Sequence, residues 1–95
     1  MNKKCAIDFM NKIYPGQDIR EDMVGTFEEL IMELSDKEIA IIKMRYGLDD
    51  GYSRTAKEVA NSFEVPEETI RKTERFAIYK LRHPLRTKRI FKKNN

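Results

Sequence analysis

The chain has 95 residues and a net charge of +3, with 37% charged residues, 40% hydrophobic residues and no Trp. This length allows one domain with one core, which excludes a substrate cleft between two domains, and the hydrophobic content excludes a disordered chain. Because the single cysteine, Cys5, cannot form an intramolecular disulfide, we expect a protein of the reducing cytoplasm.

The first two predicted helices cover residues 3–14 and about 22–34. In the first, apolar residues recur at helical spacing until Pro15 and Gly16 break the pattern. Asp8 interrupts the apolar stretch that follows the basic N-terminus, so we expect neither a signal peptide nor a membrane partner. The second helix carries one apolar stripe, expected to face the core, made of Met23, Phe27, Leu30, Ile31 and Leu34.

Two capping boxes mark the starts of the next two helices. Ser35 with Glu38 begins the third helix, which ends at Gly47, a residue that can take the left-handed conformation. Thr55 with Glu58 begins the fourth helix in the same way. The Asp- and Gly-rich segment between them is expected to be a turn, because its set of ligands is too short for a calcium loop.

The fourth and fifth helices have the linear order of a helix-turn-helix. Residues 55–63 (TAKEVANSF) lead into a turn at Glu64 and Val65, and residues 66–82 form one long stretch that Pro66 begins. No segment shows the alternation of a strand, so we predict an all-α fold of about five helices. The positions expected to be buried between these two helices are Val59, Ala60, Phe63, Val65, Ile70 and Ala77.

The faces of the fifth helix separate by polarity. Its inward side is predicted to carry Ile70, Thr73, Ala77, Ile78 and Leu81. Its outer side near the N-terminal half carries the candidates for reading bases, Glu67, Glu68, Arg71, Lys72 and Arg75. An alternative is that Glu67 and Glu68 serve only the helix dipole and that Glu74 forms surface ion pairs with Arg71 or Arg75.

Charge is strongly separated along the chain. Residues 1–70 hold 9 basic and 15 acidic groups, for a net −6, whereas residues 71–95 hold 10 basic groups and one acidic group, for a net +9. A basic end of this strength favours binding to a polyanion, because Lys and Arg displace counterions from phosphates. For residues 86–95, a tail that grips flanking phosphate and a merely solvated tail are both open.

The blocks LSDKEIAIIKMRYGLDD, TAKEVANSFEV and IRKTERFAIYKLRHP resemble region 4 of the sigma-70 family of bacterial RNA polymerase sigma factors. The most specific parts are MRYG at 44–47 and LRHP at 81–84. The resemblance implies a compact helical domain that binds the minus-35 promoter element through the second helix of its helix-turn-helix and docks on the flap of the polymerase β subunit. It divides the chain into an N-terminal helical extension (1–26), a sigma region 4-like domain (27–85) and a basic C-terminal tail (86–95).

The resemblance also implies which residues contact DNA. Glu68 and Arg71 match family positions that contact bases or nearby phosphates, and Lys37, Arg45 and Thr55 match positions that contact the DNA backbone. Arg suits guanine or phosphate, Glu can accept from cytosine, and Thr can donate to phosphate.

The chain departs from the primary sigma factors at three positions of the groove-facing turn. Those factors usually carry Arg at the positions of Glu67 and Thr69 and Gln at the position of Lys72, so we expect weaker phosphate attraction and a changed base preference. The complete set of candidate DNA-binding residues is Lys37, Arg45, Thr55, Glu68, Thr69, Arg71, Lys72 and Arg75.

These observations favour a sequence-specific DNA-binding transcription protein whose partners are double-stranded DNA and RNA polymerase. The resemblance implies that promoter melting belongs to region 2, so we expect a small regulator or one half of a split sigma factor; a homodimer or a second sigma subunit is left open. The alternative is an interaction module that binds the polymerase flap or a sigma or anti-sigma partner with little DNA binding. No catalytic set is recognisable, His83 is expected to cap or pack, and no cofactor or metal is implied.

Overall fold

A computed structural model describes residues 1–91, which form six α-helices and one 3-10 turn and contain no strand. The all-α prediction is therefore confirmed. None of these helices is long and apolar enough to cross a membrane. The elements are α1 (Lys3–Ile13), η1 (Glu21–Met23), α2 (Val24–Met32), α3 (Asp36–Tyr46), α4 (Ala56–Phe63), α5 (Glu67–Leu81) and α6 (Pro84–Ile90).

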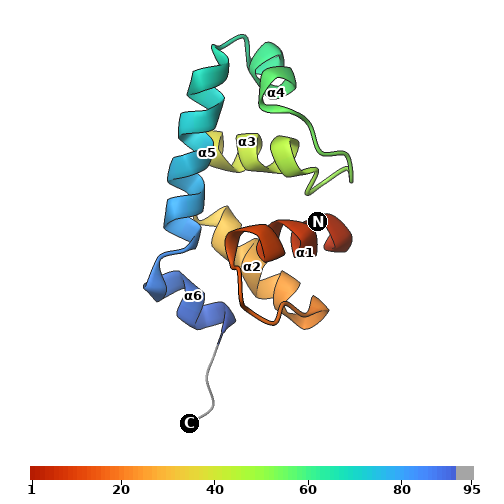
Figure 1. Cartoon of the computed structure of the whole chain (residues 1–95), viewed down its shortest axis with the longest axis vertical. Coiled ribbons are helices and arrows are strands. Elements are labelled where there is room, and N and C mark those ends of the chain that lie inside the picture. Colours follow the sequence, from red (N-terminus) through yellow and green to blue (C-terminus); the bar gives the residue numbers. More distant parts are fainter. Residues whose placement is uncertain (92–95) are drawn as a thin grey trace.

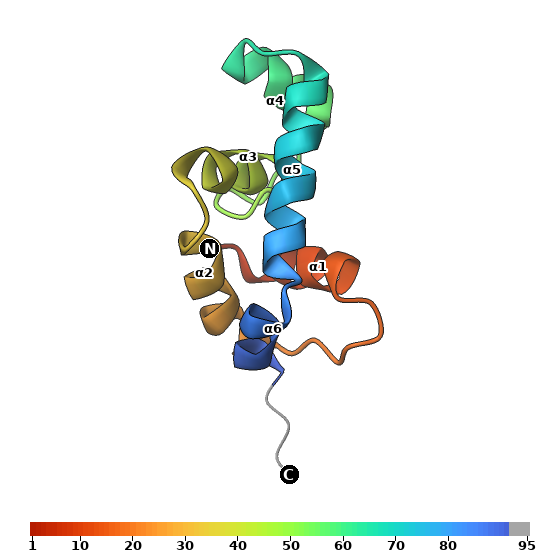
Figure 2. The same cartoon turned by 90° about the vertical axis from the view of Figure 1, so that its left-hand side faces the viewer.

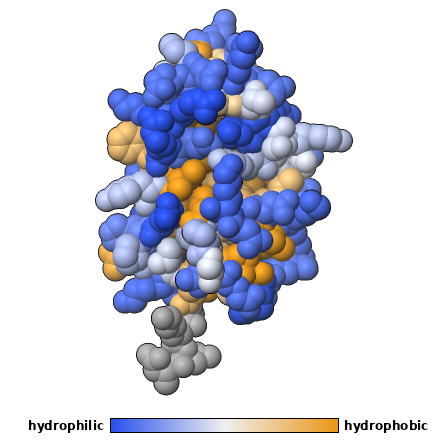
Figure 3. Space-filling model, in the orientation of Figure 1, coloured by the Kyte–Doolittle hydropathy of each residue, from blue (hydrophilic) through white to orange (hydrophobic). Residues whose placement is uncertain are grey.

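The molecule is elongated, with principal extents of 48 × 23 × 22 Å. Helix α5 runs along one side, with α4 at one end and α1, α2 and α6 near the other, while α3 crosses it between them (Figure 1). The outer surface is mostly hydrophilic around the α4 end, and hydrophobic residues show through in the middle and lower parts (Figure 3).

Both predicted capping boxes are present. The Oγ atom of Ser35 accepts from the N–H of Glu38 at 3.2 Å, and the Glu38 carboxylate accepts from the N–H of Ser35 at 3.0 Å. Thr55 and Glu58 repeat the arrangement at 3.1 and 2.8 Å. Each box satisfies backbone donors that have no partner within the helix, so both helix starts are fixed by local sequence.

The end of α3 requires glycine. Gly47 has φ of 64°, and a Cβ atom built on it would lie 2.6 Å from the backbone carbonyl carbon of Tyr52. The segment that follows is the predicted turn: Asp50 accepts from the N–H of Tyr52 at 3.0 Å and pairs with Arg54 at 2.6 Å. The chain therefore doubles back tightly between α3 and α4.

Two hydrophobic clusters share α5. The smaller one joins α3, α4 and the start of α5 through Ile41, Ala56, Val59, Ala60 and Ile70, with Met44 and Val65 packed against it. The larger one joins α1, α2, another face of α3, the C-terminal half of α5 and α6, and includes Phe9, Phe27, Leu30, Ile42, Ala77 and Leu81. The prediction that Phe63 is buried is wrong: it is 38% exposed, because it is the last residue of α4 before the turn.

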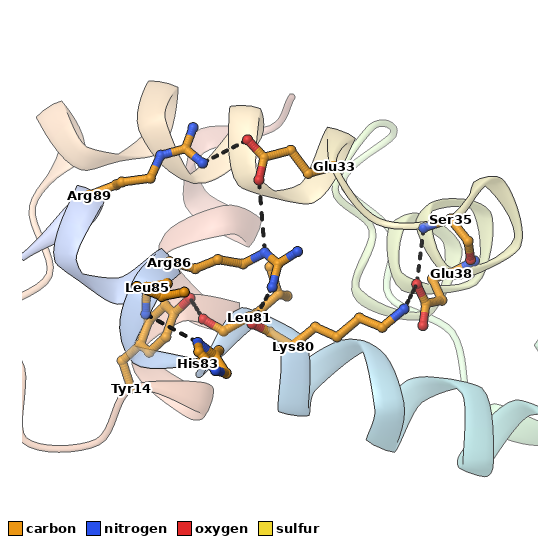
Figure 4. A network of polar contacts seen from close by, with 10 residues as sticks. All are labelled: Tyr14, Glu33, Ser35, Glu38, Lys80, Leu81, His83, Leu85, Arg86 and Arg89. Atoms are coloured by element: carbon orange, nitrogen blue, oxygen red, sulfur yellow. Dashed lines mark hydrogen bonds and ion pairs between the residues drawn. The ribbon is translucent and has the colours of Figure 1, made fainter.

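The N-terminal helix packs on the same core as α5. Phe9 stacks on the ring of Tyr46 with centroids 4.1 Å apart, and the Tyr14 hydroxyl donates to the backbone carbonyl of Leu81 at 2.8 Å in a buried position (Figure 4). Residues before 27 are therefore joined to the helix-turn-helix through the larger hydrophobic cluster.

Helix α6 is a correction to the five helices expected, because the sequence predicts only the domain end and a tail for residues 84–90. His83 caps it by accepting from the N–H of Leu85 at 3.2 Å, which confirms the capping role expected for this histidine. Ile90 is 7% exposed, and Arg89 reaches Glu33 of α2 at 2.7 Å (Figure 4). The remaining residues of the expected tail, 92–95, lie outside the described residues.

Candidate nucleic-acid interface

The predicted turn at Glu64 and Val65 joins α4 to α5. Glu64 takes the left-handed conformation with φ of 55°, and the N–H of Val65 donates to the carbonyl of Ala60 at 3.1 Å. Pro66 then caps α5 in an extended conformation. Ile70 fixes the crossing of the two helices, since it is fully buried against α4. The N-terminal half of α5 thus projects at the end of the molecule that α4 braces (Figure 2).

The outer face of α5 presents cations that carboxylates of the same helix partly neutralise. Arg71 donates to one oxygen of Glu67 from Nε at 2.9 Å and from Nη2 at 2.6 Å. The Nη2 atom of Arg75 donates to Glu68 at 2.9 Å. Lys72 is exposed and forms no ion pair with any residue in 1–91. The face therefore presents three cations. Two of them, Arg71 and Arg75, would have to leave a carboxylate of α5 before they could bind another anion.

Three further candidates lie at or near helix starts. Thr69 is half-buried in the first turn of α5, where its carbonyl accepts from the Thr73 hydroxyl at 2.8 Å. Thr55 is exposed, and its hydroxyl oxygen already accepts from the N–H of Glu58, so its own proton can be donated outward. Lys37 is exposed in the first turn of α3. The structure therefore leaves Lys37 and Thr55 accessible and Thr69 only partly so.

Arg45 differs from the other candidates because it is engaged inside the molecule. Its Nη1 atom donates to the carbonyl of Arg54 at 2.9 Å, its Nε atom lies 3.4 Å from a Glu74 oxygen, and its guanidinium covers the ring of Tyr46 at 5.2 Å. Its side chain is 21% exposed. This residue joins α3 to α5 and to the loop after α3.

Glu74 is a residue whose role the sequence did not indicate. It is 9% exposed and accepts a hydrogen bond from the Tyr46 hydroxyl at 2.5 Å. The alternative in which Glu74 pairs on the surface with Arg71 or Arg75 is wrong. The signal for burial was present, since position 74 continues the inward stripe that holds Ile70, Ala77 and Leu81. Burial, and after it the bond to Glu74, raise the pKa of Tyr46, so the hydroxyl remains a donor at neutral pH.

A second ion pair also ties α5 to α3. The Lys80 ammonium donates to the Glu38 carboxylate at 2.9 Å, and Glu38 is 7% exposed (Figure 4). Burial opposes ionisation of Glu38, but the hydrogen bonds from Ser35 and Lys80 outweigh it and lower the pKa of this carboxyl. With Glu74 and Lys80 both anchored on α3, the orientation of α5 is fixed at two points.

A family model for sigma-70, region 4, matches residues 30–83, which is more than half of the chain. The RNA polymerase sigma factor SigA of Lactococcus lactis subsp. cremoris is 40% identical over 85 residues, covering 90% of this chain and 21% of that protein. SigA of Lactococcus lactis subsp. lactis (strain IL1403) is also 40% identical over 85 residues, covering 90% of this chain and 20% of that protein. The chain spans about a fifth of the length of these relatives. This match shows that the chain belongs to the sigma-70 region 4 family.

Proposed function

We propose that the chain is a sequence-specific DNA-binding transcription protein that recognises a promoter element through the first turns of α5. The observation that carries this proposal is the exposure of Arg71, Lys72 and Arg75 on one face of a helix that α4 braces. A helix of this kind fits the major groove, where side chains of its N-terminal half reach base edges.

The candidate residues divide into base and backbone contacts. Arg71 and Lys72 are exposed and would donate to guanine, and Glu68, also exposed, would accept from cytosine. Phosphate contacts are assigned to the remaining exposed candidates, Lys37, Thr55 and Arg75, with Thr69 at the edge of the groove. Arg45 is assigned a positioning role, because its guanidinium already holds α5 and the loop after α3.

RNA polymerase is the proposed protein partner, since the relatives are named as its sigma factors. We infer that the chain works with a second sigma subunit or as a small regulator. A lone helix-turn-helix covers few base pairs, so useful specificity needs such a complex or a dimer.

The proposal is tested by selecting bound sequences from random duplexes and then titrating the selected duplex at several salt concentrations. Affinity should fall steeply with salt. The logarithm of the binding constant should decrease with the logarithm of the salt concentration, with a slope of about −0.9 for each phosphate contact. Arg71→Ala and Lys72→Ala should remove the sequence preference, whereas Lys4→Ala, an exposed lysine on α1, should leave it intact. Absence of duplex binding at low salt would overturn the proposal.

One observation favours a second candidate, an interaction module with little DNA binding. Glu67 and Glu68 hold the two guanidiniums of the groove-facing turn and repel phosphate themselves. Binding to polymerase or to a sigma or anti-sigma partner, with no measurable duplex affinity in the same titration, would select this function instead.

A further inference from the structure

Helix α5 exposes two large aromatic rings on the side of the molecule that Figure 2 shows at the front. Phe76 is 55% exposed and Tyr79 is 72% exposed, and residues three apart lie on the same face of a helix. The other paired rings in residues 1–91 pack on one another around the larger hydrophobic cluster, whereas these two stack on no ring of that part of the chain. Both rings are therefore accessible from outside the molecule.

Two adjoining hollows flank these rings. The first, of about 450 Å³, is lined by Lys72, Arg75, Phe76 and Tyr79. The second, of about 370 Å³, is lined by Arg75, Ile78, Tyr79, Arg82, His83 and Pro84. Because Arg75 and Tyr79 line both, the hollows form one groove along α5, which we call the aromatic groove.

The charged residues that line the aromatic groove are all cations: Lys72, Arg75 and Arg82. Lys72 and Arg82 form no ion pair with any residue in 1–91, and Arg75 pairs with the exposed Glu68 at 2.9 Å. His83 adds a further donor, because its Nδ1 atom accepts from the N–H of Leu85 and leaves the ring proton on Nε2. The groove therefore combines accessible rings with donors for an anion.

This combination matches the chemistry of an unpaired nucleic acid strand. Surfaces that bind single strands hold the phosphates with Lys and Arg and stack the bases on aromatic rings. The bases of a duplex are already stacked on their neighbours, so only an unpaired strand can offer the faces of its bases to Phe76 and Tyr79. A second copy of the chain fits poorly, since two such grooves would place their cations together.

We propose that the aromatic groove binds single-stranded nucleic acid, with bases stacked on Phe76 and Tyr79 and phosphates held by Lys72 and Arg82. The distance along α5 from Lys72 to Arg82 is about 15 Å, which accommodates about four nucleotides at the spacing of about 3.4 Å that stacked bases have. This chemistry is shared by single-stranded DNA and RNA. It does not depend on the proposed recognition of a duplex, in which the first turns of α5 read the edges of bases and not their faces.

The test measures fluorescence anisotropy of labelled strands of equal length, titrated with the full chain. The strands are oligo-dT, oligo-rU and an abasic strand, which keeps the phosphates but has no bases. The abasic strand should bind at least about tenfold more weakly than the better of the two oligonucleotides. A preference for oligo-dT or for oligo-rU supports the proposal in either case and identifies the strand as DNA or RNA.

Substitutions on α5 separate stacking from apolar contact. Tyr79→Ala, Tyr79→Leu and Phe76→Ala should each weaken binding of the better oligonucleotide by about tenfold, because none of these variants replaces the lost ring. Tyr79→Trp should retain the affinity, since an indole ring also stacks on bases. Tyr52→Ala is the matched control and should bind as the wild type does, because Tyr52 is 73% exposed and lies in the loop between α3 and α4.

The proposal is overturned if neither oligonucleotide binds, if the abasic strand binds equally well, or if the alanine variants bind as the wild type does. Full affinity in Tyr79→Leu would also overturn it, by indicating an apolar contact in place of stacking. The selected duplex decides the proposed function separately. Arg71→Ala should weaken binding of the duplex and leave the oligonucleotide unaffected, whereas Tyr79→Ala should do the reverse.

Discussion

In the N-terminal half of α5, Arg71 donates two hydrogen bonds to a single carboxylate oxygen of Glu67, at 2.9 and 2.6 Å. Under the proposed function, α5 thus carries its own competitor for DNA. The pair is exposed, so solvent screening weakens it and Arg71 can exchange Glu67 for another acceptor. Under the proposed function, a guanine within reach would compete with Glu67 for Arg71.

Glu67→Gln should therefore raise affinity for the selected duplex. The change removes a charge that repels phosphate and releases Arg71, so we expect a gain of about twofold to tenfold. Fluorescence anisotropy at a fixed salt concentration measures the affinity. The control is Glu29→Gln, which removes an exposed carboxylate of α2. Weaker binding by the variant would mean that Glu67 itself contacts a base.

Tyr46→Phe should destabilise the fold. The substitution deletes the hydroxyl that donates to Glu74 and leaves this buried carboxylate with Arg45 as its remaining partner. The expected loss is about 1–2 kcal/mol in the free energy of unfolding. Urea unfolding provides the measurement. Tyr79→Phe, at a ring that is 72% exposed, should change stability by less than about 0.5 kcal/mol. Equal effects of the two variants would contradict the anchoring role of Glu74.

Stability should fall in acid through Glu38. Burial opposes its ionisation, but the bonds from Ser35 and Lys80 leave its folded pKa below the unfolded value, which is about 4.3. A carboxyl with a lowered pKa contributes stability above its unfolded pKa, and this stability is lost as pH falls through the folded pKa. The free energy of unfolding, measured in urea between about pH 7 and about pH 3, should decline less with falling pH for Glu38→Gln than for the wild type. If the unfolding free energies of the two proteins fell with pH in parallel, Glu38 would make no contribution to the acid sensitivity of the fold.

Glu64→Gly should stabilise the turn of the helix-turn-helix. Glu64 has φ of 55°, a conformation that glycine adopts without the steric cost of a Cβ atom. We expect a gain of about 0.5–1 kcal/mol in thermal or urea unfolding. Gly47→Ala is the reciprocal control and should destabilise, since its Cβ would meet the backbone of Tyr52. A loss of stability in Glu64→Gly would show that the Glu64 side chain contributes to folding.

The features that the sequence predicted are those determined within a few residues. The capping boxes of Ser35 and Thr55, the glycine at the end of α3 and the turn at Glu64 each depend on atoms close in the chain. Helix periodicity likewise placed Arg71 and Lys72 on the surface. These local rules were sufficient to predict where α5 begins and which of its faces is exposed.

The features that the sequence missed depend on contacts between distant segments. Glu74 meets Tyr46 across 28 positions, so its partner could not be inferred from helix spacing alone. The sequence does not reveal α6, because its start at His83 and Pro84 also has the features expected of the end of α5. Its place also depends on Glu33 of α2, 56 positions from Arg89. The partners of Arg45 inside the molecule are likewise on other elements, so helix spacing does not reveal them.

Helix α5 contributes Ile70 to one hydrophobic cluster and Leu81 to the other. Neither cluster is complete when this helix is absent, so the two ends of the molecule cannot melt independently. The chain should therefore unfold in one cooperative transition, and a fragment limited to α4 and α5 would lack the contacts that keep its helices in place.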